Sequence, residues 1–363
     1  MPAEVRHPPG AQHGLGWLAA LREPARCLTW DLSQWEHVIR LSRRLRLLGR
    51  LAHAVAQAGL LDAVPPPTAR HLLAEQRYAT WRCDTLLWAL EDGARALAGA
   101  PYPVVLLKGS AYIVQGSAIG PGRLPSDVDL LVPRSSLDDA QARLSAAGWT
   151  EVALDAHDQR YYREWSHELP PLRHPHHGLE LDLHHNILPV VARTRVDAAR
   201  LIEHMRPVRG SPWHVLQPTD QVLHSAAHLF YDADHGDRVR DIVDIDGLVR
   251  QEAADPGFWP ALAGRAQELG LQQPLALALH FCRQWLDTPL PPAGTVPLPR
   301  LRWHEQHLLV PLFGRVLTPS TLDDEPTLTE RCSQQLLLAR HHLWRMPPAM
   351  LVAHTWNKLR RPR

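Results

Sequence analysis

The sequence predicts an α+β fold in which a small mixed β-sheet core is flanked by N-terminal and C-terminal helical regions. Three observations predict this arrangement. Helical periodicity fills most of the first hundred or so residues, short apolar runs typical of strands follow, and helical periodicity then resumes after Pro189. We therefore expect a helical region over 1–100, an α/β core over 101–188 and a second helical region over 189–363.

Two long helices are expected before the core. Apolar residues spaced by threes and fours over 35–55 predict one amphipathic helix. The prolines at 65–67 end that pattern, and a second helix is expected over 69–98. The side chains that we expect this second helix to bury are Leu72, Leu73, Trp81, Leu87, Trp88 and Leu90.

The core is expected to contain four strands and one clear helix. The apolar runs 104–107 and 128–132 have the pattern of buried strands. A capping residue before it and a glycine after it predict a helix over 137–147. Two further strands are expected over 159–165 and 179–185, separated by a turn rich in proline and histidine. Mixed strand directions follow from this order.

The last region is expected to be helical again. Apolar periodicity predicts helices within 221–250, 260–286 and 328–356. Segments rich in proline separate these stretches.

Composition excludes several classes of protein. The chain has 363 residues, 39 Lys and Arg against 38 Asp and Glu, and 45% hydrophobic residues. This balance argues against a disordered chain and against a strongly basic protein that coats nucleic acid. The four dispersed cysteines suit a reducing compartment, and neither a signal peptide nor a run of about 18 apolar residues is present. We expect a cytoplasmic protein that does not span a membrane.

Carboxylates alternate along two of the expected strands. Asp127 and Asp129 project from one face of a strand, where they can hold one or two divalent metal ions. In a later strand, Asp182 shares a face with Glu180 and His184, whereas the leucines between them point to the core. Three carboxylates can then converge from neighbouring strands. Phosphoryl or nucleotidyl transfer by two metal ions requires such a set.

A phosphate-binding turn is expected where the first strand ends. Gly109 lets the backbone approach a phosphate, the hydroxyl of Ser110 can donate to it, and a helix begins there. Each motif alone is usually an ordinary turn or a solvated edge, but their combination favours a functional site. Lys108 precedes the turn, and Lys358 is the only other lysine in this arginine-rich chain. We therefore take Lys108 as a candidate for contact with phosphate or acceptor.

Histidines form two further groups. His224 and His228 lie four residues apart on one helix face, a spacing that can bind zinc. No third ligand is established, so packing or exposure to a cleft is the favoured interpretation. The histidines within 174–177 fall in an expected turn, where solvation is favoured over metal binding.

Charged residues after these helical histidines have the spacing of helix ion pairs. Arg238 with Asp241, and Arg240 with Asp244, are spaced to pair along one helix.

The sequence resembles the polymerase-beta type of nucleotidyltransferase superfamily, whose signature is a hydrophobic residue, Gly, Gly or Ser, then Asp-x-Asp and a later Asp. It is more closely similar to a bacterial family of uncharacterised nucleotidyltransferases with an LLKG motif, an Arg followed by DIDLLV, and a DLHW motif. The resemblance covers most of the chain, and the matching residues are 107–110, Arg123, 127–132 and 182–184. His185 stands where the family usually has Trp, and Asp241 where an aromatic residue is common. Neither difference touches an expected metal ligand.

The resemblance implies Mg²⁺-dependent transfer of a nucleoside monophosphate from an NTP to an acceptor that the family does not define. Asp127 and Asp129 would be shared ligands of a two-ion site. Asp182 would complete the site and help to deprotonate the acceptor. The nucleotide would be held by Lys108, Gly109, Ser110, Arg123, His228, Arg238 and Asp244, of which the last three belong to a helical region that closes over it.

Other functions stay open at this point. A non-catalytic nucleotide-binding protein, or a toxin–antitoxin-like partner on the same fold, is the main alternative, although the complete carboxylate set argues against it. A metal-dependent phosphohydrolase centred on His224 and His228 lacks an adjacent His-Asp pair. The acceptor can be a small molecule, a protein side chain or an RNA end. A net charge of +1 disfavours a long nucleic acid but leaves a tRNA open.

Overall fold

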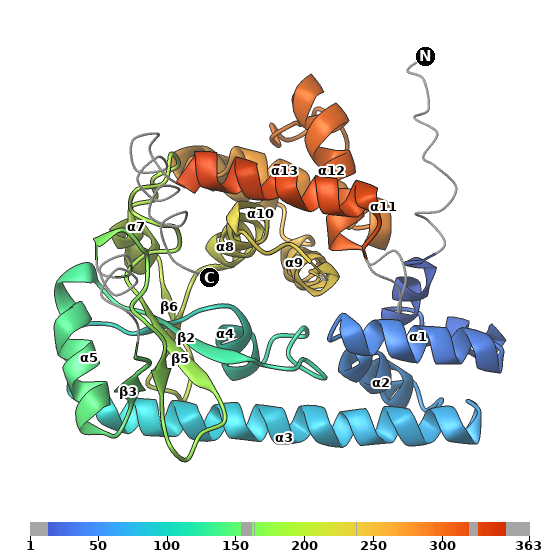
Figure 1. Ribbon diagram of the computed structural model, residues 1–363, viewed down its shortest axis with the longest axis horizontal. Helices are drawn as coiled ribbons and strands as arrows, with labels where there is room; N and C mark the ends of the chain where they lie inside the picture. The colour runs from blue at the N-terminus through green and yellow to red at the C-terminus, as the bar shows by residue number, and fades with distance from the viewer. Residues whose placement is uncertain (1–13, 154–161, 163, 237, 319–325, 346–363) are drawn as a thin grey trace.

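The computed structural model describes residues 14–153, 162, 164–236, 238–318 and 326–345. Within these residues it confirms the α+β fold: a seven-stranded mixed sheet is flanked by helices from both ends of the chain (Figure 1). None of the described helices has both the length and the apolar character needed to cross a membrane.

The N-terminal helices differ in part from the expectation. After two 3₁₀ segments, Gly16–Leu21 and Pro24–Thr29, come α1 (Leu32–Arg44), α2 (Leu48–Gln57) and α3 (Pro66–Ala96). The single helix expected over 35–55 is therefore wrong. The chain leaves the helix at Arg46, whose φ of 55° lies in the left-handed region, and a second helix starts two residues later.

Helix α3 confirms the helix expected over 69–98 but not all of its expected core. Leu72 and Leu90 are buried. Four other expected core side chains are 40–56% exposed: Leu73, Trp81, Leu87 and Trp88. The reason is position, since α3 runs along one edge of the molecule and packs against its neighbours on one side only (Figure 1).

The sheet has the strand order β3-β4-β5-β2-β1-β7-β6. Its strands are β1 (Val105–Leu106), β2 (Asp127–Leu131), β3 (Thr150–Glu151), β4 (Leu172–Arg173), β5 (Glu180–His184), β6 (Arg206–Pro207) and β7 (His214–Val215). The two long strands, β2 and β5, are parallel neighbours, with Asp129 opposite Asp182. Strand β1 pairs with β2 in the antiparallel sense, so strand directions are mixed as expected.

Several strands were not expected or lie elsewhere. The strand expected over 159–165 falls mostly outside the described residues, and the two of its residues assigned to an element, Tyr162 and Glu164, are helical. The antiparallel edge is instead made by the short strands β3 and β4. Two more strands, β6 and β7, come from the stretch after residue 189, where helices were expected.

Helices cover the sheet from within the core and from the C-terminal region. The helices α4 (Lys108–Val114), α5 (Leu137–Ala146), which confirms the expected helix, and the short α7 (Ala198–Glu203) lie between strands along the chain. They are followed by α8 (Pro218–Tyr231), α9 (Val239–Glu252), α10 (Phe258–Glu268), α11 (Gln272–Leu286), the π-helical turn η4 (Glu305–Leu309), α12 (Val310–Leu317) and α13 (Leu328–Arg345). The expected segments 221–250 and 260–286 each contain two helices, and residues 346–356 lie outside the described part.

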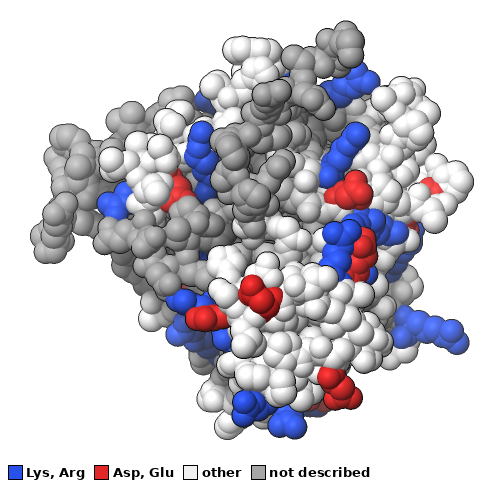
Figure 2. Space-filling model, turned by 90° about the vertical axis from the view of Figure 1, so that its right-hand side faces the viewer, with Lys and Arg blue, Asp and Glu red and all other residues white. Residues whose placement is uncertain are grey.

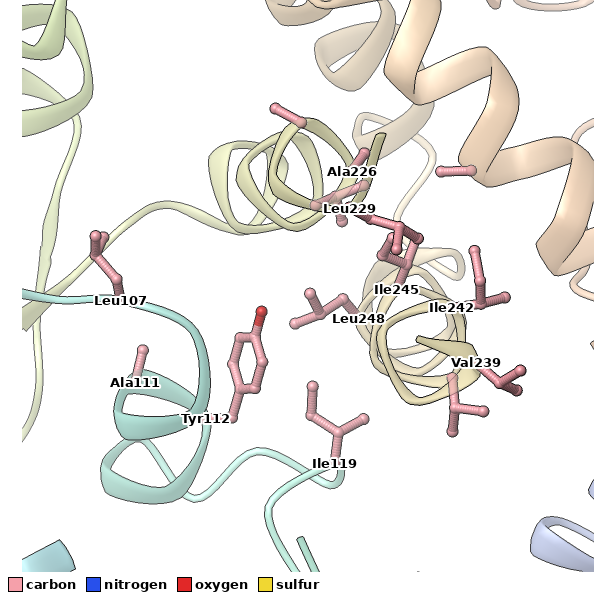
Figure 3. Close-up of a cluster of buried hydrophobic side chains, with 14 of the residues drawn as sticks. Leu107, Ala111, Tyr112, Ile119, Ala226, Leu229, Val239, Ile242, Ile245 and Leu248 are labelled. Atoms are coloured by element: carbon pink, nitrogen blue, oxygen red, sulfur yellow. The ribbon is translucent and has the colours of Figure 1, made fainter. Parts of the chain in front are cut away.

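A hydrophobic cluster joins α4 to the C-terminal helices. The ring of Tyr112 stands between α4 and α9, and its hydroxyl points toward α8 (Figure 3). That hydroxyl shares a 2.6 Å hydrogen bond with Ser225 Oγ on α8. Apolar side chains around it come from three segments: Leu107, Ala111, Ile119, Ala226, Leu229, Val239, Ile242, Ile245 and Leu248. Burial of this cluster therefore fixes α8 and α9 over one end of the sheet.

The N-terminal helices dock on the core through a backbone contact between two glycines. A Cβ at Gly49, in α2, would overlap the carbonyl oxygen of Gly122, and a Cβ at Gly122 would overlap that of Gly49. Gly122 also has a φ of 69°, which L side chains rarely adopt. Beside this contact, Arg50 donates from Nη2 to the carbonyl of Ile119 at 2.8 Å. Only glycine permits so close an approach.

We expect Gly49→Ala to lower the free energy of unfolding, because the new methyl group overlaps backbone atoms that cannot move aside like a side chain. The matched control is Gly264→Ala in α10, where a Cβ meets nothing within 4 Å. That substitution is expected to raise the free energy of unfolding by about 1 kcal/mol through helix propensity alone. Urea denaturation measures both changes, and stabilisation by both would contradict the glycine contact.

Candidate functional site

A cavity of about 420 Å³ lies between the junction of α1 and α2, the start of α4, and helices α8 and α9. Its walls are polar, with six cationic and four acidic side chains. The lining residues are Arg44, Leu45, Arg46, Lys108, Gly109, Tyr112, Arg123, Ser126, Asp127, Ser225, His228, Asp234, Gly236, Arg238, Arg240, Asp241 and Asp244. Seven of the candidate metal- and nucleotide-binding residues are in this set: Lys108, Gly109, Arg123, Asp127, His228, Arg238 and Asp244.

The carboxylate of Asp129 is buried and contacts Lys108, a residue that lines the cavity. Its side chain is 2% exposed, and one oxygen, Oδ1, accepts both from Lys108 Nζ at 3.0 Å and from His184 Nε2 at 2.9 Å. Burial would raise the pKa of Asp129, but the charge of Lys108 and the hydrogen bond from His184 outweigh it and hold that pKa below its usual range. Asp129 is therefore a fixed anion.

For the neighbouring carboxylates of Asp182 and Asp127, nearby cations do not offset the effect of burial on the pKa. Burial raises the pKa of Asp182 to about 8, and the charges of Asp129 and Glu168 add to the effect. Burial also raises the pKa of Asp127, with a further contribution from Asp129. The carboxylate of Asp127 accepts a 2.9 Å hydrogen bond from Ser126 Oγ. The strands thus concentrate more negative charge than the local cations neutralise.

This donor set fits a divalent cation. One ligand atom each from Asp129, Asp182 and His184 lies within 4.8 Å of the others. Asp127 is not part of that trio, although it lies two residues from Asp129 on the same strand face. Carboxylate oxygens are the ligands that Mg²⁺ prefers, and a bound cation would relieve the repulsion that adds to the effect of burial on the pKa of Asp182. The residues are suited to hold a metal between β2 and β5.

Only part of the expected phosphate-binding turn, residues 108–110, faces the cavity. Lys108 is the first residue of α4, and its φ of 43° lies in the left-handed region. Gly109 lines the cavity, and a Cβ there would overlap the guanidinium of Arg123. Ser110 is fully buried, does not line the cavity, and has a hydroxyl with no hydrogen-bond partner in the described part of the chain. Only Lys108 and Gly109 therefore reach the cavity.

Asp244 on α9 holds two buried arginines from distant parts of the chain. Its Oδ1 pairs with Arg50 on α2. Its Oδ2 accepts from Nε and Nη2 of Arg123 at 3.2 and 3.0 Å. The guanidinium of Arg123 lies 5.6 Å from the ring centroid of Tyr112. Arg123 is therefore fixed between Gly109, Tyr112 and Asp244, with its charge at the wall of the cavity.

Of the two ion pairs expected from the helix spacing, one forms and the other does not. Arg238 Nε donates to Asp241 Oδ2 at 2.6 Å, which confirms one expected pair. Arg240 does not pair with Asp244 and lies instead 3.6 Å from Asp241 Oδ1. The reason is that both oxygens of Asp244 are already taken by Arg50 and Arg123.

The helical histidines face the cavity or the core. Arg238 Nη2 lies 2.8 Å from His228 Nδ1, and because arginine only donates, that ring nitrogen accepts. Burial, together with the charges of Lys108 and Arg238, lowers the pKa of His228 well below its usual value. His224 is buried, with its ring centroid 6.3 Å from that of His228. No metal-ligand group found among the described residues includes either histidine.

Several site residues escaped the sequence analysis. His184 follows the strand alternation from Asp182 and was placed on its face but not assigned a role. Arg44 and Arg46 enter the cavity from the N-terminal helices. They could not be identified from the sequence, because no local pattern shows which side of the core their arginine-rich segment packs on.

Comparison with known proteins gives one family. The family model described as "Uncharacterised nucleotidyltransferase" matches residues 31–287. This range begins at the N-cap of α1, ends after α11 and includes every residue that lines the cavity. No curated protein and no solved structure matches the chain.

We expect Asp244→Asn to destabilise the fold strongly, because it leaves Arg50 and Arg123 buried without a counter-ion. Removing one partner of a buried ion pair typically costs about 3–5 kcal/mol. The matched control is Glu23→Ala, which breaks the exposed pair between Glu23 and Arg26 and should change stability little. Equal small effects in denaturant titrations of both variants would contradict the central role of Asp244.

Proposed function

The chain belongs to the uncharacterised nucleotidyltransferase family, and from this membership we propose that it transfers a nucleoside monophosphate from an NTP to an acceptor with the help of Mg²⁺. Nucleotidyl transfer is the kind of reaction that the family name states. The metal, the residues that bind the NTP and the class of acceptor are our proposal.

The observation that carries the proposal is the parallel register of β2 and β5. It sets Asp129 directly opposite Asp182, with Asp127 two residues away on the same face. These carboxylates lie beside a cavity whose wall carries six cationic side chains. A metal-binding carboxylate set next to a cationic cavity suits a substrate with several phosphates.

The cavity suits the triphosphate of an NTP. Ligand pockets usually measure about 300–1,000 Å³, and the volume of about 420 Å³ lies within that range. Lys108 is the first residue of α4, and Arg123 reaches the start of that helix from the loop before β2. Arg240 comes from α9 and Arg46 from the α1–α2 junction. Gly109 leaves room for the guanidinium of Arg123, which packs against its backbone at the wall of the cavity. We assign the cationic residues to the phosphates.

We assign each of the carboxylates and Lys108 a role in the proposed reaction. Asp127, Asp129 and Asp182 hold the metal, while Lys108 keeps Asp129 ionised and in place. Divalent cations bound there supply charge neutralisation and help to activate the acceptor hydroxyl. The acceptor oxygen forms a bond to the α-phosphorus, the bond to the β-phosphate breaks, and pyrophosphate leaves. We assign to Asp182 the removal of the acceptor's proton.

The acceptor that we propose is a small molecule or a protein side chain rather than a long nucleic acid. The net charge is +1, so a uniformly basic surface is not expected. Figure 2 shows acidic and basic side chains interspersed over one face of the molecule. The cationic residues of the cavity are matched to one triphosphate instead of an extended phosphate backbone.

The first test uses NTPs labelled at the α-phosphate, Mg²⁺ and a cell lysate as the source of acceptor. Wild type should transfer label and release pyrophosphate, and Asp127→Asn/Asp129→Asn should abolish both. The matched control, Asp138→Asn/Asp139→Asn, removes two neighbouring exposed carboxylates on α5 and should leave both intact.

Calorimetry distinguishes the proposed enzyme from the main alternative. A non-catalytic nucleotide-binding protein would bind NTP without Mg²⁺ and keep that binding in the Asp127→Asn/Asp129→Asn variant. That outcome, with no transfer of label by wild type, would overturn the proposed reaction.

A second test concerns the phosphate contacts. Arg240→Met should weaken binding of a non-hydrolysable NTP about tenfold, which corresponds to about 1.4 kcal/mol. Arg240 is chosen because its nearest described carboxylate, that of Asp241, is 3.6 Å away and already bound by Arg238. The control is Arg283→Met, an exposed arginine of α11 outside the cavity. Equal affinities for both variants would remove Arg240 from the nucleotide site.

A further inference from the structure

A second group of metal-ligating side chains lies away from the cavity, between α3 and the turn that joins β4 to β5. Asp92 belongs to α3, and His174 and His177 belong to the turn. Each offers one ligand atom, and the three atoms lie within 4.8 Å of one another. None of the three lines the cavity. This group is therefore separate from the carboxylates of β2 and β5.

The expectation that the histidines of this turn are solvated is wrong for His177, although His176 is exposed. Its side chain is fully buried, with an exposed fraction of 0%. The ring stacks on Trp149 at a centroid distance of 5.4 Å and meets the edge of Trp88 at 4.7 Å. Two tryptophans thus hold the imidazole in one orientation beside α3. A side chain fixed in this way is preorganised for a ligand.

One ring nitrogen of His177 is satisfied and the other is not. Nε2 lies 2.6 Å from Asp92 Oδ2, whereas Nδ1 is buried and has no hydrogen-bond partner within the described ranges. Because Nε2 is the nitrogen that faces Asp92, a metal held between the two residues would take Nε2 and Oδ2 as ligands, with the ring proton on Nδ1.

His174 supplies the second imidazole. Its ring centroid lies 4.7 Å from that of His177. The salt bridge from Arg95 to Asp92 uses Oδ1, the oxygen that does not meet His177, and Arg95 is 68% exposed. That arginine can therefore turn into solvent without disturbing the contact between Asp92 and His177.

We propose that Asp92, His174 and His177 form a binding site for a divalent transition metal, with Zn²⁺ as the best match. Imidazole nitrogens with one carboxylate suit zinc, whereas the carboxylates of β2 and β5 suit Mg²⁺. The bound metal ties the β4–β5 turn to α3, and β5 carries Asp182. The site is structural in character, and it does not depend on the proposed reaction.

The test titrates Zn²⁺ into the chelator-treated full-length protein by calorimetry, with excess Mg²⁺ present. Among the described residues, the two other potential metal groups, Asp129 with Asp182 and His184, and His167 with Glu168 and His184, share His184. His184→Gln therefore removes one ligand from each group, while the excess Mg²⁺ competes for the carboxylates that remain, and we expect this variant to keep one equivalent of zinc. Co²⁺ in place of Zn²⁺ gives an absorption spectrum that reports imidazole coordination.

His174→Ala and Asp92→Asn should each weaken zinc binding to the His184→Gln protein by about 100-fold or more, the upper end of losses seen even for outer-sphere partners. The matched control is His176→Ala, an exposed histidine of the same turn outside the group, which should change the affinity less than twofold. Circular dichroism confirms folding of each variant. Zinc affinity that is unchanged by His174→Ala, or zinc that is lost with His184→Gln in an otherwise folded protein, would overturn the proposal.

Discussion

Asp244 binds two buried guanidinium groups, and the three parts of the molecule meet at this carboxylate. Arg50 comes from the N-terminal helices, Arg123 from the loop before β2, and Asp244 from the helices after the sheet. Buried charges in a protein interior require partners in good geometry, so none of the three segments can move independently. The contact between Gly49 and Gly122 lies beside this ion pair and brings the backbones close enough for it to form.

The contacts of Asp244 determine the shape and charge of the cavity. Arg123 presents its guanidinium beside Gly109 because Asp244 holds it there. The chain leaves helix at Arg46, between α1 and α2, and both Arg44 and Arg46 line the cavity at this junction. The cationic wall therefore comes from segments distant in sequence, while the carboxylates come from one pair of strands. The residues proposed to bind phosphate and those proposed to bind metal thus come from different parts of the fold, and Lys108 lies between them.

The sequence predicted the elements whose cause is local. The apolar run before Lys108 and the alternation around Asp129 specify β1 and β2, and the alternation around Asp182 specifies which side chains of β5 share a face. The break between α1 and α2 could not be predicted, because it is made at an arginine with positive φ rather than at glycine or proline. The partners of Asp244 could not be predicted either, since they lie 121 and 194 residues away.

The long separation between Arg50 and Asp244 has a consequence for synthesis of the chain on the ribosome. At about 5–20 residues per second, the 194 residues between them take roughly 10–40 s to be made. During that interval Arg50 is without the anion that it pairs with in the finished fold. The ion pair that fixes the N-terminal helices can therefore form only after α9 has been made.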